Sequence, residues 1–275
     1  MSRRRRADKG PRVDLHCHTI HSDGLYAPED VARMAAQAGL SALAITDHDL
    51  PPVLGSGVRN FGEHSIRLVA GVELSTMHEN RELHLLVYFP GEMPADFAEW
   101  CRDRARWRAS WYDESIDLLG LDIPKADAQA RQGLRTLTRV HLARAVVAAG
   151  ITSTLHQAFE QYVGGSADRI PELNMAFLDA LSVAKDAGGW TAWAHPPPKQ
   201  AEEWAASFAA AGLDALESYR PNKSARNRLS RLSHGLGMGI SGGSDWHGWE
   251  KRKMGSFRIP AQVLHKTDVA LNLHN

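Results

Sequence analysis

The sequence has little cysteine and no excess charge of either sign, and both shortages narrow the possible roles of the protein. Two cysteines, Cys17 and Cys101, cannot build a disulfide framework, so we expect a reducing, cytoplasmic setting. The 32 basic residues balance the 32 acidic ones, which gives a formal net charge of +0. No overall field therefore draws the chain to nucleic acid or to anionic lipid, although a local basic pocket remains allowed.

The first residues also lack a membrane-targeting signal. Four arginines at positions 3–6 are followed by a short stretch with no apolar run and then by the first predicted strand. A secretory signal would need a run of apolar residues at this place. We expect residues 1–10 to form a disordered basic tail and we expect no contact with a membrane; a weak contact of the tail with nucleic acid is the alternative.

Strand-like apolar segments alternate with helical patterns along most of the chain, which is long enough for an α/β barrel of about 250 residues. Strands are predicted at residues 13–17, 42–46, 66–75, 83–89, 190–194, 215–219 and 239–244. Helices are predicted at residues 28–38, 174–188, 201–211 and 224–236, and residues 257–275 add a strand-like piece and a short helix. Residues 51–63 show only a weak pattern. We predict an α/β fold, a parallel barrel with its site on one rim.

Residues 94–172 interrupt this alternation with a helical texture. Phe97, Trp100, Trp107, Trp111 and Leu118 recur at helical spacing, and residues 138–149 and 152–162 give two shorter helical patterns. Aromatic residues at such intervals usually bury a core face, so we expect packing rather than chemistry from them. The predicted domains are a barrel of residues 11–93 and 173–275 and a helical insert of residues 94–172 that covers the active site.

Imidazole and carboxylate side chains gather at the ends of the predicted strands. His16 and His18 are two apart on a strand and therefore project from the same face. The whole set is His16, His18, Asp23, His48, Glu73, His84, His195, Asp245 and His247. A single histidine is more often a hydrogen-bonded core or surface residue, but burying this whole set without a cation would be costly. Zinc, manganese and iron prefer such ligands, and the set exceeds what one ion can use, so we predict two or three divalent ions.

Six separated segments, HCHTIHSDG, ITDHD, AGVELS, LHLLVY, AHP and GGSDWH, resemble in order the motifs of the PHP (polymerase and histidinol phosphatase) family. The resemblance covers nearly the whole chain outside the C-terminal tail. It implies a distorted seven-stranded (β/α) barrel with a di- or trinuclear metal centre. It also implies three ion sites, the first formed by His16, His18, Glu73 and Asp245, the second by Glu73, His84 and His195, and the third by Asp23, His48 and His247.

The segment LTRVHLARAVVAAG within the insert resembles the nucleotide phosphoesterase branch of that family, whose members remove phosphate from AMP-like molecules and 3′,5′-nucleoside bisphosphates. This implies that Arg139, His141 and Arg144 face the site and hold phosphate; solvated charges on a helix are the alternative. The sequence departs from the branch at His195-Pro196-Pro197-Pro198, where a Gly commonly follows the His-Pro pair, and at Tyr219-Arg220. Arg220 or Lys199 could supply a further phosphate contact.

We therefore expect a metal-dependent phosphoesterase that hydrolyses phosphate monoesters of small nucleotides with a hydroxide bridging two ions. The expected catalytic residues are His16, His18, Glu73, Asp245 and His247, and His247 or His195 is the candidate acid for the leaving group. Three alternatives remain: an exonuclease acting on short oligonucleotides, a histidinol-phosphatase-like enzyme, and a non-enzymatic module that uses the same site.

Overall fold

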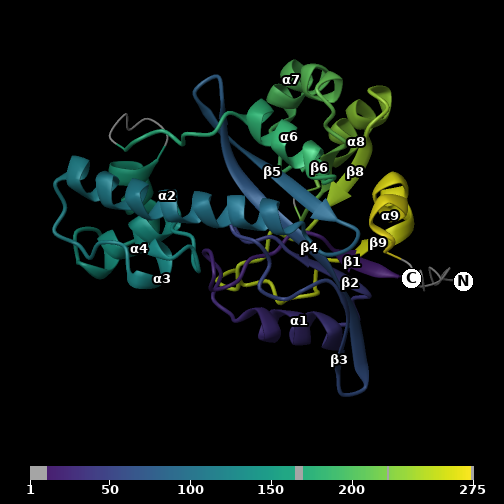
Figure 1. Cartoon of the computed structure of the whole chain (residues 1–275), viewed down its shortest axis with the longest axis horizontal. Coiled ribbons are helices and arrows are strands. Elements are labelled where there is room, and N and C mark those ends of the chain that lie inside the picture. Colours follow the sequence, from purple (N-terminus) through teal and green to yellow (C-terminus); the bar gives the residue numbers. More distant parts are fainter. Residues whose placement is uncertain (1–10, 165–169, 222, 274–275) are drawn as a thin grey trace, which may run out of the picture.

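A nine-stranded sheet forms the centre of the computed structural model, which describes residues 11–164, 170–221 and 223–273 (Figure 1). The predicted basic tail, residues 1–10, lies outside the described residues. The strands are hydrogen-bonded in the order β8-β7-β6-β5-β4-β2-β1-β9, and β3 pairs with β4. They are β1 (Arg12–Asp14), β2 (Ala42–Ile45), β3 (Gly57–Phe61), β4 (His64–His78), β5 (Arg81–Phe89), β6 (Trp190–Trp193), β7 (Ala215–Tyr219), β8 (Gly239–Gly242) and β9 (Ile259–Pro260).

The two ends of this sheet meet and nearly close it into a barrel. The backbone N–H of Leu15 donates to the carbonyl of Gly242 over 3.3 Å, and the N–H of Asp245 donates to the carbonyl of His16 over 2.8 Å. Strands β1, β2 and β4 to β8 therefore surround an interior packed with small and branched apolar side chains. The α/β barrel of PHP type predicted from the sequence is confirmed.

Strand β5 runs antiparallel to both of its neighbours, so the prediction of a parallel barrel is wrong at this strand. The turn between β4 and β5 contains only Glu79 and Asn80, which have φ values of 45° and 59°. Such a short turn joins only antiparallel strands, because a parallel pair needs a crossover of about a dozen residues. The start of β5 therefore lies on the rim where the parallel strands end, and this brings His84 to that rim.

Strand β3 was not anticipated, since residues 51–63 show only a weak pattern. It pairs antiparallel with β4 at the edge of the fold, and most of its residues are exposed. Val58, for example, is 59% exposed. A strand that buries neither face carries no alternation of apolar and polar residues, which is the signal that predicts strands.

Helices cover the outside of the barrel. Helix α1 (Pro28–Gln37) begins at a proline and buries Val31, Ala32 and Ala35 in a cluster with side chains of β2 and β4. Helices α6 (Phe177–Asp186), α7 (Pro198–Ala210) and α8 (Arg226–Gly235) pack their apolar faces on the β5 to β7 side. The 3₁₀ turn Ala261–Leu264 and helix α9 (His265–Leu271) join the core near β1 and β8. These helices were predicted from the sequence within a few residues.

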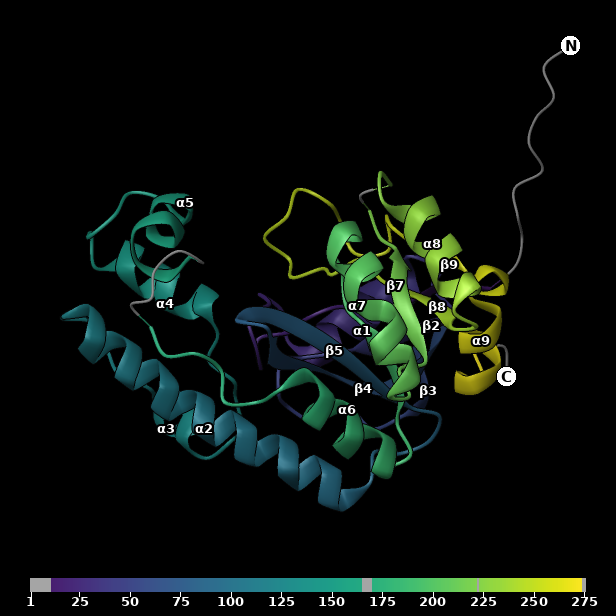
Figure 2. The same cartoon turned by 90° about the horizontal axis from the view of Figure 1, so that it is seen from above.

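The helices of the predicted insert form a layer on one side of the barrel (Figure 2). They are α2 (Ala95–Leu119), α3 (Ala128–Arg131), α4 (Arg139–Ala148), α5 (Leu155–Ala158) and a π-helical turn, Phe159–Val163. Trp111 is 1% exposed in their shared core, and its indole N–H donates to the carbonyl of Pro171. At its other end α2 packs Phe97 and Cys101 into the apolar cluster between the barrel strands and helices α6 to α8, so the domain boundary at residue 94 stays a proposal.

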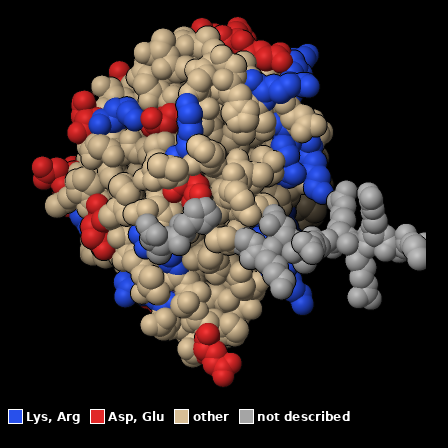
Figure 3. Space-filling view, turned by 90° about the vertical axis from the view of Figure 1, so that its right-hand side faces the viewer, with Lys and Arg blue, Asp and Glu red and all other residues tan. Residues whose placement is uncertain are grey.

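The surface carries charges of both signs. Basic and acidic side chains lie near one another on the face shown in Figure 3, in keeping with a net charge of +0. Among the described residues, no helix combines the length and the apolar composition that crossing a membrane requires.

Candidate metal centre

Four of the predicted ligands direct donor atoms to one point inside the rim of the barrel. The Nε2 atoms of His16 and His18 lie 3.2 Å apart, and each lies 3.1–3.4 Å from Glu73 Oε2 and Asp245 Oδ1. Four donors at about 2.1 Å from one tetrahedral ion would lie about 3.4 Å from one another. This first donor set therefore has the spacing that a single divalent ion requires.

Glu73 also belongs to a second donor set through its other oxygen. Glu73 Oε1 lies 3.1 Å from His84 Nδ1 and 3.1 Å from His195 Nε2, and these two nitrogens are 3.2 Å apart. One carboxylate thus faces two donor sets with its two oxygens, which is the geometry of a bridging ligand between neighbouring ions.

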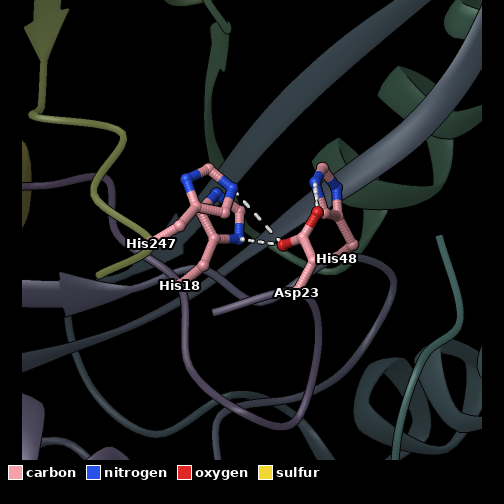
Figure 4. Close-up of side chains that lie close together, drawn as sticks. All are labelled: His18, Asp23, His48 and His247. Atoms are coloured by element: carbon pink, nitrogen blue, oxygen red, sulfur yellow. Dashed lines mark ion pairs between the residues drawn. The ribbon is translucent and has the colours of Figure 1, made fainter. Parts of the chain in front are cut away.

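A third donor set lies on the other side of His18. Its members are Asp23, His48 and His247, drawn with His18 in Figure 4. Asp23 Oδ1 lies 3.3 Å from His247 Nε2, and Asp23 Oδ2 lies 3.7 Å from His48 Nε2. This set is more open than the first two. All nine predicted ligands therefore gather at one rim, in the three groups that the family resemblance implies.

Hydrogen bonds outside the donor sets leave the inward nitrogen of three imidazoles free to bind a cation. His16 Nδ1 donates to Glu217, His84 Nε2 donates to Glu82, and His247 Nδ1 donates to the carbonyl of Asp245. Because carboxylate and carbonyl oxygens only accept, the neutral ring in each case carries its proton on the outer nitrogen. The inner nitrogen then presents a lone pair, as metal-bound histidines do.

The buried oxygen Oε2 of Glu73 gives a direct test of whether ions fit. It accepts no hydrogen bond from any residue in the described ranges. Yet nitrogens of His16, His18 and His48 lie 3.1, 3.2 and 3.4 Å from it. A buried carboxylate oxygen without a donor is unfavourable, and a cation among these nitrogens would satisfy it. The residues present therefore fit a divalent ion.

The electrostatics of the ion-free site reflect this crowding of opposite charges. Burial alone would raise the pKa of Glu73, but the neighbouring imidazoles outweigh it and hold that pKa well below its usual range. Burial would lower the pKa of His84, but Glu73 raises it to about 10. The same opposition, with Asp23 as the partner, raises the pKa of His247 to about 10. Burial dominates at His48, whose pKa falls to about 4.

Two carboxylates that support the site were missed in the sequence. Glu217 is fully buried, and it accepts from His16 Nδ1 over 2.9 Å and from the backbone N–H of His195 over 2.7 Å. Glu82 accepts from His84 Nε2 over 3.2 Å and pairs with Arg139 Nε over 2.8 Å. A glutamate in the middle of the predicted strand 215–219 was the available signal for the first of them.

The predicted phosphate contacts of the insert take different roles. Besides pairing with Glu82, Arg139 donates to the carbonyl of Val163 over 2.7 Å, so its guanidinium is already engaged. His141 accepts from the backbone N–H of Thr138 at the start of α4, and burial lowers its pKa to about 4. It is therefore neutral near pH 7 and carries its proton on Nε2.

Arg144 lies beside the third donor set. Its guanidinium donates to the carbonyl of Asp23 over 3.3 Å and sits 4.4 Å from the ring of Trp249, which itself stacks on His247. Arg220 follows β7, and its carbonyl accepts from Arg226. No described contact joins the guanidinium of Arg220 to a donor set, so its role stays a prediction.

Two ligands sit on backbone that L-residues rarely adopt. His195 has φ = 33° and Asp245 has φ = 52°. His195 comes two residues after the end of β6 and Asp245 three residues after the end of β8, and their side chains turn toward Glu73 and His16. Positive φ at residues other than glycine costs on the order of 1 kcal/mol or more, and such positions cluster at functional sites.

Comparisons with known proteins agree with this centre. Residues 14–206 match the family model described as the PHP domain. The chain is 28% identical over 249 residues to the 5′-3′ exoribonuclease Rnm of Escherichia coli, covering 85% of this chain and 84% of that protein. It is 27% identical over 252 residues to the 3′,5′-nucleoside bisphosphate phosphatase of Chromobacterium violaceum, covering 86% and 87%.

A solved structure extends the likeness to the fold. It comes from Bifidobacterium adolescentis, is described as a candidate metal-dependent phosphoesterase, and has a TM-score of 0.75 at 24% identity over 94% of this chain and 96% of that one. The family match spans more than half of the sequence and includes seven of the nine candidate ligands, from His16 to His195. The chain belongs to the PHP domain family and is a metal-dependent phosphoesterase.

Proposed function

We propose that the protein hydrolyses phosphate monoesters of small nucleotides, 3′,5′-nucleoside bisphosphates or AMP-like molecules. The observation that carries the proposal is the bridging position of Glu73 between two closely spaced donor sets, with the Arg144 guanidinium beside the third. A relative named 3′,5′-nucleoside bisphosphate phosphatase supports the same substrate class.

Two or three divalent ions, manganese, zinc or iron, are proposed as cofactors. His16, His18, Glu73 and Asp245 would hold one ion, Glu73 with His84 and His195 a second, and Asp23, His48 and His247 a third. When bound, such ions lower the pKa of water from about 15.7 to about 7 and neutralise charge on the phosphoryl oxygens.

The protein's own side chains would position the substrate. Arg144 would pair with a phosphate oxygen, and the neutral His141 would offer its Nε2 proton as a hydrogen-bond donor. Glu73 and Asp245 face the donor sets and are therefore poor candidates for a free general base. His247 and His195 remain the two candidates for the acid of the leaving group, because each has one ring nitrogen aimed at a donor set.

A substrate panel tests the proposal. The metal-reconstituted protein is assayed for phosphate release from a 3′,5′-nucleoside bisphosphate, AMP and histidinol phosphate under identical conditions. We expect kcat/KM to be at least about ten-fold higher for one of the nucleotides than for histidinol phosphate, a difference of about 1.4 kcal/mol in transition-state binding. Equal or better turnover of histidinol phosphate would reject the nucleotide assignment.

An exonuclease acting on short oligonucleotides is the second candidate. Its support is the similarity to proteins named 5′-3′ exoribonuclease, which reaches 30% identity over 253 residues for the one from Haemophilus influenzae. Labelled dinucleotides with an intact phosphodiester separate the two functions, because a strict monoesterase leaves that bond uncut.

A further inference from the structure

A groove of about 320 Å³ is lined by the two chain neighbours of His247, a member of the third donor set. Helix α1 and the loop of residues 246–254 form its walls, and its lining includes Tyr26, Trp246, Gly248, Lys251 and Lys253. Trp246 and Gly248 are the chain neighbours of the ligand His247. The groove is therefore continuous in sequence with the third donor set, and its volume lies within the range of about 300–1,000 Å³ found for ligand pockets.

The groove presents an exposed aromatic ring. Tyr26 stacks on the buried Trp246 with 5.5 Å between ring centroids and an interplanar angle of 20°, and it remains 41% exposed. The backbone fixes this ring relative to the site. Leu25 donates its N–H to the carbonyl of His247 over 2.8 Å, and the carbonyl of Tyr26 accepts from Ile20 over 3.0 Å. A preordered aromatic side chain of this kind can stack on a nucleobase.

The groove also carries positive charge that its own residues do not neutralise. Lys251 and Lys253 are exposed, and neither pairs with an acidic side chain within the described ranges. The acid of the same loop, Glu250, accepts from the backbone N–H groups of His247 and Gly248 over 2.9–3.2 Å. Its carboxylate is thus already hydrogen-bonded by the backbone, and the two ammonium groups remain available to an anion.

We propose that this groove binds the nucleotides of a single-stranded nucleic acid whose terminal phosphate lies at the metal centre. Lys251 and Lys253 would pair with backbone phosphates, and Tyr26 would stack on a base. The inference rests on the second candidate function, the exonuclease. AMP has no second phosphate, and the second phosphate of a 3′,5′-nucleoside bisphosphate sits on the same ribose as the first. Contacts of the groove beyond this first nucleotide therefore serve oligonucleotides alone.

Binding of a cleavage-resistant oligonucleotide tests the groove independently of catalysis. A 5′-phosphorylated eight-residue RNA with phosphorothioate linkages and a 3′ fluorophore is titrated with the metal-loaded protein at several salt concentrations. The test variant is Lys251→Gln/Lys253→Gln. The matched control is Lys125→Gln/Lys266→Gln, which removes the same charge from lysines outside the groove. Tyr26→Leu removes the stacking surface and keeps an apolar side chain against Trp246.

We expect the test variant to raise Kd for the RNA about ten-fold and to reduce the slope of log Kd against log salt concentration by about 1.4. Tyr26→Leu is expected to raise Kd about five-fold or more. The control should match the wild type, and KM for a 3′,5′-nucleoside bisphosphate should be unchanged in every variant. The proposed role of the groove is overturned if the test variant has the Kd and salt slope of the wild type. It is also overturned if the wild type does not bind the RNA.

Cleavage of an unmodified RNA separates the test of the groove from the test of the exonuclease function. If the wild type binds RNA through the groove and leaves the unmodified RNA intact, the groove stands and the exonuclease function fails. If wild type and test variant cleave the RNA equally well, the exonuclease function stands and the groove is overturned.

Discussion

Glu217 holds the imidazole of His16 from behind, with 2.9 Å between Glu217 Oε1 and His16 Nδ1. The other oxygen, Oε2, accepts from the backbone N–H of His195 over 2.7 Å. One buried carboxylate on β7 thus fixes the ring of a ligand from the first donor set and the backbone of a ligand from the second. Each oxygen of Glu217 accepts one of these two bonds. The residue therefore acts by positioning the two candidate ligands.

Replacing Glu217 by glutamine should weaken metal binding. The amide has the shape of the carboxylate, but its NH₂ group must face one of the two N–H donors that Glu217 accepts from. Loss of such a supporting contact typically lowers metal affinity about 10- to 100-fold. The measurement is retained metal after dialysis against buffers of fixed free manganese or zinc.

Glu202→Gln provides the control for that substitution. Glu202 is an exposed glutamate on α7. It pairs with Arg228, and no described contact joins it to a donor set. Metal content should be unchanged in this variant. If Glu217→Gln also retains wild-type affinity, the carboxylate does not orient the ligands.

Removing a direct ligand should have a larger effect than removing a supporting one. In Asp245→Ala or His18→Ala the first donor set loses one of its four members. Loss of a supporting contact lowers activity by about 100-fold at most, and we expect turnover of a nucleotide substrate to fall by more than that in these variants. The far-ultraviolet circular dichroism spectrum should stay that of the wild type. Full activity in either variant would refute the assigned metal centre.

The candidate ligands could be identified from the sequence because their signals are local. The alternation of residues 15–18 predicts that His16 and His18 project together, although β1 itself ends at Asp14 and only Cys17 continues the pairing as an isolated bridge. Short segments around His195 and Asp245 follow predicted strands, whereas Glu73 lies inside β4, which extends to His78. The supporting residues carry a weaker signal, which for Glu217 is only its place within a predicted strand and for Glu82 is absent. Glu82 and Glu217 look like solvent-facing acids until the barrel closes and aims them inward.

Arg139 illustrates the same limit. Its place on α4 is correctly predicted, but its guanidinium is taken by Glu82 and by the carbonyl of Val163, contacts between segments that are about 55 and about 25 residues apart. The antiparallel direction of β5 was also missed, although the two-residue turn before it was a usable signal. The contacts of Arg139 and the direction of β5 both depend on pairing between separate segments of the chain.

Arg144→Ala should weaken substrate binding more than it slows chemistry. A charge-assisted hydrogen bond contributes about 1.5–3 kcal/mol, so we expect KM for a nucleotide substrate to rise about ten-fold or more. Because Arg144 also contacts the carbonyl of Asp23, the metal content of the variant must be measured alongside. Arg106→Ala on α2, where the arginine pairs with Glu99 and Asp103, is the control and should leave KM unchanged. An unchanged KM in Arg144→Ala would place that residue on the solvent side.

Gly243→Ala should disrupt the closure of the barrel. A Cβ at this position would lie 2.2 Å from Cβ of His16 and 2.5 Å from its backbone nitrogen, so β1 and the end of β8 could not keep their spacing. Overpacking of this kind costs about 1–3 kcal/mol of unfolding free energy, measured by urea denaturation. At Gly235, the last residue of α8, an added Cβ meets nothing within 4 Å. Gly235→Ala should therefore be neutral or stabilising, and equal losses in both variants would contradict the packing argument.

Metal affinity should fall as the pH is lowered. Without ions, the pKa values of His84 and His247 are both about 10, so both imidazoles are protonated near neutrality. An ion must displace the inner proton of each ring, and mass action then weakens binding about ten-fold per pH unit for each proton released. His48, with a pKa of about 4, is already neutral and releases none. Calorimetric titration with manganese between pH 6 and 8, in buffers of different ionisation enthalpy, counts these protons. An affinity independent of pH, with no proton release, would mean that the ions bind elsewhere.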